Sequence, residues 1–120
     1  MTLEADIQRE ITSWLDTQKA IGRLDHWRVT IGVALVGKGI RRKNHMRGHP
    51  DLAGVLRPGA RYFTIEVKRP GSLAGRWYPE QLEWGTRLRE DGVLYIVATS
   101  VEDVRRALEE HHPSGKGVPA

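Results

Sequence analysis

Three charged residues have the types and the spacing that chemistry on a phosphate group requires. Glu66 and Lys68 stand two apart in the segment 62–68, where apolar and polar residues alternate as in a strand with one buried face. Side chains two apart on a strand project from one face, roughly 6–7 Å from each other. Asp51 begins another short apolar run, and if the two runs pair as a hairpin its carboxylate approaches that of Glu66.

A pair of neighbouring carboxylates favours a divalent cation. Two like charges about 4 Å apart repel by roughly 4 kcal/mol at an effective dielectric constant near 20, and a cation relieves that repulsion. The chain has no cysteine, so the hard oxygen ligands favour Mg²⁺, with Mn²⁺ able to substitute and with water and a substrate phosphate completing the coordination. Such a metal lowers the pKa of a bound water for phosphodiester hydrolysis, and Lys68 would stabilise the attacking hydroxide or the developing negative charge.

Considered alone, Glu66 and Lys68 have a simpler interpretation. A Glu-x-Lys pair on a solvated sheet face is usually an exposed ion pair that contributes roughly 0–1 kcal/mol. The context favours a site, because the segment 48–52 precedes a hairpin of suitable length, and the pair ends the second strand of that hairpin just before Pro70.

The positive charges are concentrated in one segment of the chain. Between Asp25 and Asp51 there is no acidic residue, although the segment holds six arginines and lysines. Such a strip suits the phosphates of a nucleic acid, and the alternative is an ordinary solvated loop. The candidate phosphate-binding residues are Lys38, Arg41, Arg42, Lys43 and Arg47, together with Arg69 next to the Glu-x-Lys pair.

Length and composition limit the classes of protein that fit. The chain has 120 residues, 39% of them hydrophobic and 28% charged, with a mean hydropathy of −0.48. These values predict a single soluble domain over residues 1–120, and we expect the C-terminal tail to fray from His111. The sequence has neither a secretory signal nor an apolar run long enough for a membrane, so we expect a cytoplasmic protein. The absence of cysteine excludes disulfide scaffolds, thiolate zinc sites and cysteine nucleophiles.

Periodicity and turn residues predict a mixed central sheet flanked by helices. Leu3, Ile7, Ile11 and Leu15 recur at helical spacing, and Gly22 is a plausible helix end. The expected order is α-β-β-β-α-β-α, which belongs to the α/β class. The expected elements are a helix over 3–20, strands over 26–36, 51–56 and 62–68, a helix from Pro79 to the stop signal at Gly92, a strand over 94–98 and a last helix capped by Ser100.

Two further polar residues are candidates for the site. Glu4 and Glu10 both flank the apolar stripe of the first helix, and periodicity does not choose between them as a metal ligand. Glu4 is also explained as an acid at the helix N-terminus that complements the helix dipole. Gln81 shares a helix face with Trp84 and Leu88, so it points inward, either as a positioning residue or as a satisfied core amide.

Histidine and aromatic residues offer weaker signals. His45 and His49 would suit a histidine-metal nuclease, but Gly48 and Pro50 disfavour a ligand-bearing helix there. Trp77 and its neighbour Tyr78 lie beside Arg76 and would either stack on exposed bases or pack under a loop.

Together these motifs resemble the VRR-NUC family within the PD-(D/E)XK nuclease superfamily. The matching segments are Gly48-x-Pro50-Asp51-Leu52, Ile65-Glu66-Val67-Lys68, Gln81 and, in the first helix, Glu4-Ala5-Asp6-Ile7-Gln8. The resemblance extends from residue 4 to about 108. Each motif alone is weak, whereas the set is specific.

The resemblance implies a restriction-endonuclease-like fold and a metal-dependent nuclease. It implies that Glu4, Asp51, Glu66 and the Val67 carbonyl surround the metal. It implies further that Lys68 is the catalytic lysine and that Gln81 positions the reacting groups. Stand-alone members of the family resemble compact homodimers that act on branched DNA, similar to Holliday-junction resolvases.

The residues therefore support one main hypothesis and two competing ones. The main hypothesis is a Mg²⁺-dependent DNA endonuclease that acts as a homodimer on branched DNA. The first alternative is a non-catalytic, basic nucleic-acid-binding module on a nuclease fold, with salt-sensitive binding and no Mg²⁺-dependent product. The second is a basic protein-interaction domain that binds neither DNA nor RNA at low salt.

Overall fold

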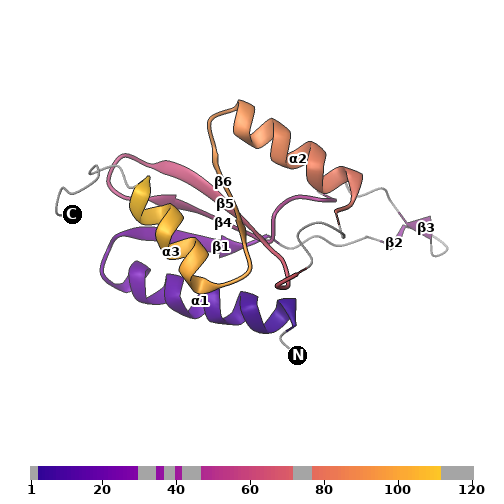
Figure 1. Cartoon of the computed structure of the whole chain (residues 1–120). Helices are drawn as coiled ribbons and strands as arrows, with labels where there is room; N and C mark the ends of the chain where they lie inside the picture. The colour runs from indigo at the N-terminus through magenta and orange to yellow at the C-terminus, as the bar shows by residue number, and fades with distance from the viewer. Residues whose placement is uncertain (1–2, 30–34, 37–39, 42–46, 72–76, 112–120) are drawn as a thin grey trace.

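A four-stranded mixed sheet forms the centre of the computed structural model, which describes residues 3–29, 35–36, 40–41, 47–71 and 77–111 (Figure 1). In spatial order the strands are β1 (Leu24–Arg28), β4 (Leu52–Leu56), β5 (Arg61–Val67) and β6 (Leu94–Ala98). β4 is antiparallel to both β1 and β5, and β5 pairs in parallel with β6. The architecture confirms the α/β class and is that of a restriction-endonuclease-like fold.

The helices divide between the two faces of the sheet. α1 (Glu4–Ala20) and α3 (Val101–Glu110) pack on one face, and α2 (Pro79–Glu90) lies on the other, as Figure 1 shows. α2 connects β5 to the parallel strand β6, which requires a crossover of this kind. No helix in the described ranges has both the length and the apolar character that a membrane span needs.

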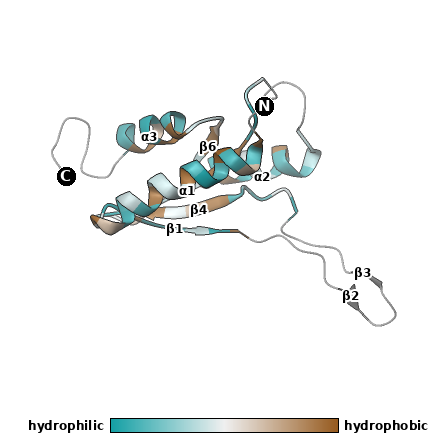
Figure 2. Cartoon of the chain, turned by 90° about the horizontal axis from the view of Figure 1, so that it is seen from below, coloured by the Kyte–Doolittle hydropathy of each residue, from teal (hydrophilic) through white to brown (hydrophobic). Residues whose placement is uncertain are grey.

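The hydrophobic core lies between the sheet and the α1/α3 layer. β5 alternates, so that Phe63, Ile65 and Val67 are fully buried against side chains such as Ile11 and Leu15 of α1. In Figure 2 apolar segments recur along α1 between hydrophilic ones, as a one-sided helix requires. Burying each of these large side chains contributes roughly 1.5–3 kcal/mol. The core residues on this face hold β5 in place, and the side chains on its opposite face are free of the α1/α3 core.

The helix boundaries follow the capping signals. α1 is followed at Gly22 by a positive φ of 79°, which a glycine adopts without strain. At the start of α3, the Ser100 hydroxyl accepts a hydrogen bond from the Asp103 backbone N–H at 3.2 Å. Asp103 in turn accepts a bond from the Thr99 backbone N–H at 2.9 Å. The expected Gly22 stop and Ser100 cap are therefore confirmed.

One expected strand is wrong in its extent. Instead of a continuous strand over 26–36, β1 ends at Arg28, and a separate two-stranded sheet of β2 (Leu35–Val36) and β3 (Ile40–Arg41) projects from the main sheet (Figures 1 and 2). β1 ends where β4 begins, because Arg28 pairs with Leu52. Beyond that pair the Val29 N–H donates to the Asp51 carbonyl at 3.0 Å, and the residue before Asp51 is Pro50, which has no N–H to donate to a ladder. The β-branched residues beyond this point indicated a strand but not its break.

At Gly48 the backbone of the segment before β4 comes close to the backbone at the start of α2. Its φ is +89°, and a Cβ there would lie 2.5 Å from the backbone carbonyl carbon of Glu80. Gly22 has a similar φ of +79°, but a Cβ would meet nothing within 4 Å. The two glycines therefore share the conformational requirement and differ in the space around them.

Replacing Gly48 by alanine is expected to destabilise the protein more than replacing Gly22 by alanine. Both variants place a side chain at positive φ, and Gly48→Ala additionally forces α2 away from its neighbour, at an extra cost of about 1–3 kcal/mol. Urea unfolding of both variants measures the difference. Equal losses of stability would contradict the close approach.

Candidate active site

The ends of β4 and β5 bring the two candidate carboxylates to one point. Leu52 pairs with Ile65, so the antiparallel register places Asp51 opposite Glu66 just beyond the last ladder pair. The Asp51 Oδ2 accepts a hydrogen bond from the Val67 backbone N–H at 2.9 Å. The structure thus places Asp51 and Glu66 next to each other at this edge of the sheet, as the predicted hairpin requires.

Glu66 and Lys68 are both buried. Their exposed fractions are 3% and 4%, and Lys68 Nζ lies 3.8 Å from Glu66 Oε2. The interpretation as an exposed ion pair is therefore wrong, because a solvated pair would keep both charged groups in water. Burying a charged group is unfavourable unless it has partners, so this pair needs the contacts that surround it.

Gln81 at the start of α2 supplies those contacts. Its Nε2 donates to Glu66 Oε2 at 3.2 Å, and its Oε1 accepts a bond from Lys68 Nζ at 3.1 Å. The same Oε1 accepts from the Tyr78 backbone N–H at 3.1 Å, which satisfies a donor just before the first turn of α2. One amide therefore joins the catalytic candidates to each other and to the helix that faces them.

Trp77 completes the enclosure of the lysine. Lys68 Nζ lies 4.5 Å from the centroid of the Trp77 ring, within the range of a cation–π contact. Of the two interpretations of Trp77, the contact favours packing against the protein. The indole limits the access of water to the ammonium group and holds it beside Gln81.

The segment 47–51 makes further contacts with α2 besides the close backbone approach at Gly48. The Trp84 Nε1 donates to the Arg47 carbonyl at 3.1 Å. The rings of His49 and Trp84 meet edge to face with centroids 4.8 Å apart, and His49 Nδ1 lies 2.8 Å from the Pro50 carbonyl oxygen. These contacts give His49 a packing role in the described structure, whereas His45 lies outside the described residues.

Burial raises the pKa values of both carboxyls, and nearby negative charge adds to the rise. For Glu66, desolvation is the main cause, the Asp51 charge adds to it and the Lys68 charge opposes it, and the resulting pKa is about 8. Desolvation also raises the pKa of Asp51 above its ordinary value, against the hydrogen bond from the Val67 N–H. The protein thus holds two acidic groups whose ionised forms are disfavoured unless positive charge is supplied.

Glu4 lies within electrostatic reach of this pair. It is exposed in the first turn of α1, and its charge contributes to the raised pKa of both Asp51 and Glu66. Glu10 lies six residues further along the same helix, about 9 Å along its axis. The electrostatic contribution favours Glu4 over Glu10 as the residue of α1 that faces the site.

The donor set fits a hard cation such as Mg²⁺. Among the residues that the structure describes, no three acidic or histidine side chains gather closely enough to hold a metal by themselves. Mg²⁺ commonly binds through one or two carboxylates, with water and substrate phosphate completing its shell. Asp51 and Glu66, with the adjacent backbone carbonyl of Val67, offer such a partial set.

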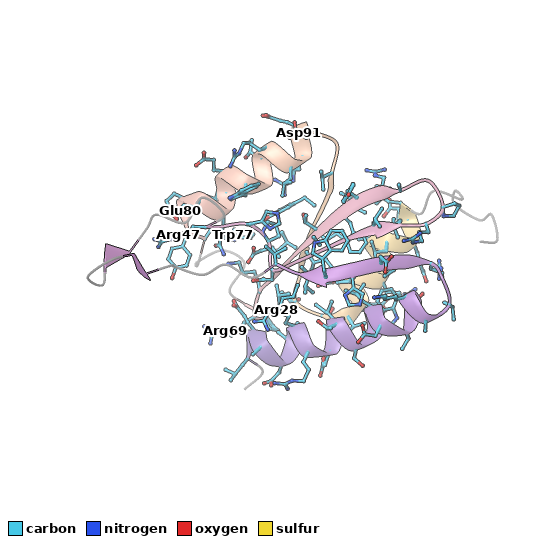
Figure 3. The ribbon with its side chains drawn as sticks, turned by 180° about the vertical axis from the view of Figure 1, so that it is seen from behind. Arg28, Arg47, Arg69, Trp77, Glu80 and Asp91 are labelled. Atoms are coloured by element: carbon cyan, nitrogen blue, oxygen red, sulfur yellow. The ribbon has the colours of Figure 1, made fainter. Side chains whose placement is uncertain are left out.

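Arginines surround the same end of the sheet. Figure 3 labels Arg28, Arg47 and Arg69 toward the end from which β2 and β3 project. Arg47 is exposed, with its Nε 3.7 Å from Glu80 Oε2, and Arg69 is half-buried directly after Lys68. Of the other phosphate-binding candidates, Lys38, Arg42 and Lys43 lie outside the described residues, and only the backbone of Arg41, in β3, is described.

The sequence did not single out Tyr95, which packs next to the site. Tyr95 pairs with Thr64 across the parallel ladder. Burial is the main cause, followed by the Glu66 charge, of the rise in its pKa to about 12, so its hydroxyl stays protonated at neutral pH. Gly85 of α2 makes room for the ring, because a Cβ there would lie 3.0 Å from Tyr95 Cζ. Tyr95 lies next to the site because β6 pairs in parallel with β5. The sequence does not specify this pairing, so it gave no indication that Tyr95 belongs near the site.

Comparison with protein families gives the site its context. The model of the VRR-NUC domain matches residues 4–102. The chain belongs to the VRR-NUC family. This confirms the resemblance that the motifs indicated, and it makes the chain a nuclease-type, DNA-related domain. No curated protein and no solved structure matches the chain.

The matched region of this VRR-NUC domain contains every residue of the site. It begins at Glu4 and includes Asp51, Glu66, Lys68 and Gln81. Four of these belong to the contact and charge network just described, and Glu4 joins it through its charge. The geometry and the family match therefore point to the same end of the sheet.

The raised pKa of Glu66 predicts how metal-free stability depends on pH. A carboxyl that titrates near 4.5 in the unfolded chain and near 8 in the fold binds its proton more tightly when folded. Without metal, the wild-type VRR-NUC domain should therefore lose unfolding free energy relative to Glu66→Gln as the pH rises from about 5 to 8. Urea unfolding in EDTA at several pH values measures this.

Glu102→Gln is the matched control. Glu102 is exposed, and the hydrogen bond from Arg105 holds its pKa below the ordinary value, so its titration lies below this pH window. This variant should follow the wild-type slope between pH 5 and 8. A Glu66→Gln curve parallel to the wild type over the same range would contradict the raised pKa.

Proposed function

We propose that this VRR-NUC domain is a Mg²⁺-dependent endonuclease that hydrolyses phosphodiester bonds in DNA. One observation carries the proposal: the half-buried Asp51 adjoins the buried pair of Glu66 and Lys68, which Gln81 holds by hydrogen bonds of 3.2 and 3.1 Å. An ordinary structural ion pair needs neither a second carboxylate nor an amide that serves both charges. The cluster has the composition of a site that binds a cation and an anionic phosphate together.

Mg²⁺ is the metal that these residues suit best, and Mn²⁺ should replace it. The carboxylates of Asp51 and Glu66 and the carbonyl of Val67 would hold the ion, with Glu4 close enough to add negative charge. When bound, the ion supplies Lewis-acid polarisation of the phosphate and a lower pKa for water. Positive charge at this point would also favour the ionised forms of the two carboxyls, whose pKa values burial raises.

Lys68 has the position of a group that stabilises negative charge at the reacting phosphate. Its ammonium group is fixed by Gln81, Glu66 and the Trp77 ring, so little reorganisation is needed during the reaction. Because the group is buried, its interaction with a phosphate oxygen is screened less than it would be in water. Gln81 serves as a positioning residue, since it orients both Lys68 and Glu66.

We extend the proposal to the form of the substrate and of the enzyme. Arg28, Arg47 and Arg69 around the site supply positive charge for phosphates on either side of the scissile bond (Figure 3). We propose branched DNA as the preferred substrate and a homodimer as the active form, because a two-fold pair of sites can nick two strands of a junction symmetrically. We also propose that the protein acts in the cytoplasm.

Cleavage assays with site variants test the proposed activity. Lys68→Met keeps the packing volume and removes the charge, and Asp51→Asn keeps the shape and removes the carboxylate. Each should lower Mg²⁺-dependent cleavage by roughly a hundredfold or more, which is the size of effect expected when a group that stabilises the transition state is lost. Linear, flapped, single-stranded and four-way DNA are incubated with Mg²⁺, Mn²⁺ or EDTA, and the products are resolved on denaturing gels.

Lys19→Met is the matched control for the lysine variant. Lys19 is an exposed lysine near the end of α1, paired with Asp25 at 3.5 Å, and its loss should leave cleavage unchanged. Circular dichroism checks that each variant is folded. Full activity of folded Lys68→Met or Asp51→Asn overturns the proposal. DNA binding by the wild type without any metal-dependent product would favour the non-catalytic binding module instead.

A further inference from the structure

A pocket lies on the α2 side of the sheet, beside the two carboxylates, and the proposed reaction does not use this pocket. It has a volume of about 350 Å³, and its lining is almost entirely apolar and aromatic. We propose that this pocket binds an unpaired nucleobase of the DNA strand whose phosphate enters the active site. This inference rests on the proposed function and adds to it a substrate class, namely DNA with an unpaired nucleotide next to the cleaved bond.

The strand register puts the pocket next to the active site on the same face. Thr64 lies two residues before Glu66 on β5, so the two side chains share a face about 7 Å apart. Ala53 pairs with Thr64, and Trp27 pairs with Ala53, which extends this row across the sheet to β1. The pocket floor is therefore the row that adjoins the carboxylates, within reach of a base whose own phosphate lies at the site.

Aromatic side chains form one wall of the pocket. Trp27 and Tyr62 meet edge to face with centroids 6.3 Å apart, yet they are 44% and 57% exposed. Leu88 of α2 and Val93, just before β6, also line the pocket. A planar apolar group seated in the pocket would cover aromatic surface that the described residues leave in water, as bases do when they stack on tryptophan and tyrosine.

The floor carries a polar atom that lacks a partner. Thr64 is 5% exposed, and within the described structure its Oγ1 makes no hydrogen bond. A buried hydroxyl without a partner is unfavourable, and a valine would fill the same volume without that penalty. The Thr64 Oγ1 is closed to solvent, so we expect a small rotation of this side chain to expose it to the edge of a nucleobase, which presents both donors and acceptors.

The dimensions favour an unpaired base over the other occupants. A paired base is stacked inside its duplex and has to be extruded before it can enter such a pocket, whereas an unpaired base enters at much lower cost. A second copy of this chain would bury about 800 Å² of surface on each partner. Among the described residues, the large exposed apolar side chains at this concavity are Trp27 and Tyr62.

Binding of single-stranded DNA with and without bases tests the inference. The probes are a fluorescein-labelled twelve-residue oligothymidine and a fully abasic strand with the same number of phosphates, and their binding is followed by anisotropy in EDTA. The wild type should bind the oligothymidine roughly five- to a hundredfold more tightly than the abasic strand, which is the range that stacking of one base accounts for. The phosphate contribution is the same for both probes, so the ratio isolates the base.

Three variants locate the effect. Trp27→Ala and Tyr62→Ala should each remove most of the preference for bases and leave abasic binding unchanged. Thr64→Val should weaken oligothymidine binding severalfold without lowering stability, because the hydroxyl has no partner to lose. The matched control is Ile21→Ala, which removes an apolar side chain that is 68% exposed and lies outside the pocket, and it should bind like the wild type.

The outcomes separate this inference from the proposed function. Equal binding of the two probes by the wild type, or a preference that survives in both aromatic variants, overturns the pocket assignment. Sedimentation that shows a wild-type dimer converted to a monomer by Tyr62→Ala also overturns it, since the face would then seat a second copy. Mg²⁺-dependent cleavage with no base preference removes only the pocket, whereas base-dependent binding with no cleavage of any DNA supports the pocket and removes the nuclease.

Discussion

The burial of Glu66 and Lys68 beside the half-buried carboxylate of Asp51 is the constraint on which the rest of this structure depends. Glu66 and Lys68 are almost inaccessible to water, and Asp51 is held against the same strand by the Val67 N–H. The ionised cluster carries more negative than positive charge in a place where charges are poorly solvated, which is why the pKa of Glu66 rises to about 8. Gln81 can satisfy hydrogen bonds but supplies no charge. A divalent cation, with a bound phosphate, would compensate the excess negative charge that the side chains leave.

The two faces of β5 have different roles, and this explains how the cluster is held in place. Phe63, Ile65 and Val67 anchor the strand in the core, and the residues between them, Thr64 and Glu66, project to the α2 side. Any shift of register by one residue would exchange the core and the site, so the hydrophobic core fixes the position of the carboxylates. α2 meets the segment before β4 through the Gly48 approach and the Trp84 bond, and this contact keeps Gln81 over Glu66.

Much of this arrangement could be predicted from the sequence because it rests on periodicity and short motifs. The stripe of α1, the apolar run of β6 and the Ser100 cap each have a local cause, and the Glu-x-Lys alternation placed both side chains on one face. The end of β1 at Arg28 depends on its partner strand, and the environment of Tyr95 depends on parallel pairing, so neither has a local signal. The burial of Lys68 was missed for a similar reason, because its contacts with Trp77 and Gln81 come from a different part of the chain.

The most direct test of the central claim is the thermal stability of the protein as a function of Mg²⁺ concentration near neutral pH. A ligand that binds only the folded state raises the melting temperature as its concentration passes the dissociation constant. The account predicts a saturable rise for the wild type, and no rise for Asp51→Asn, while the exposed-site variant Asp16→Asn behaves like the wild type. A melting temperature of the wild type that does not respond to Mg²⁺, or an equal rise in Asp51→Asn, would contradict the claim that these carboxylates form a cation site.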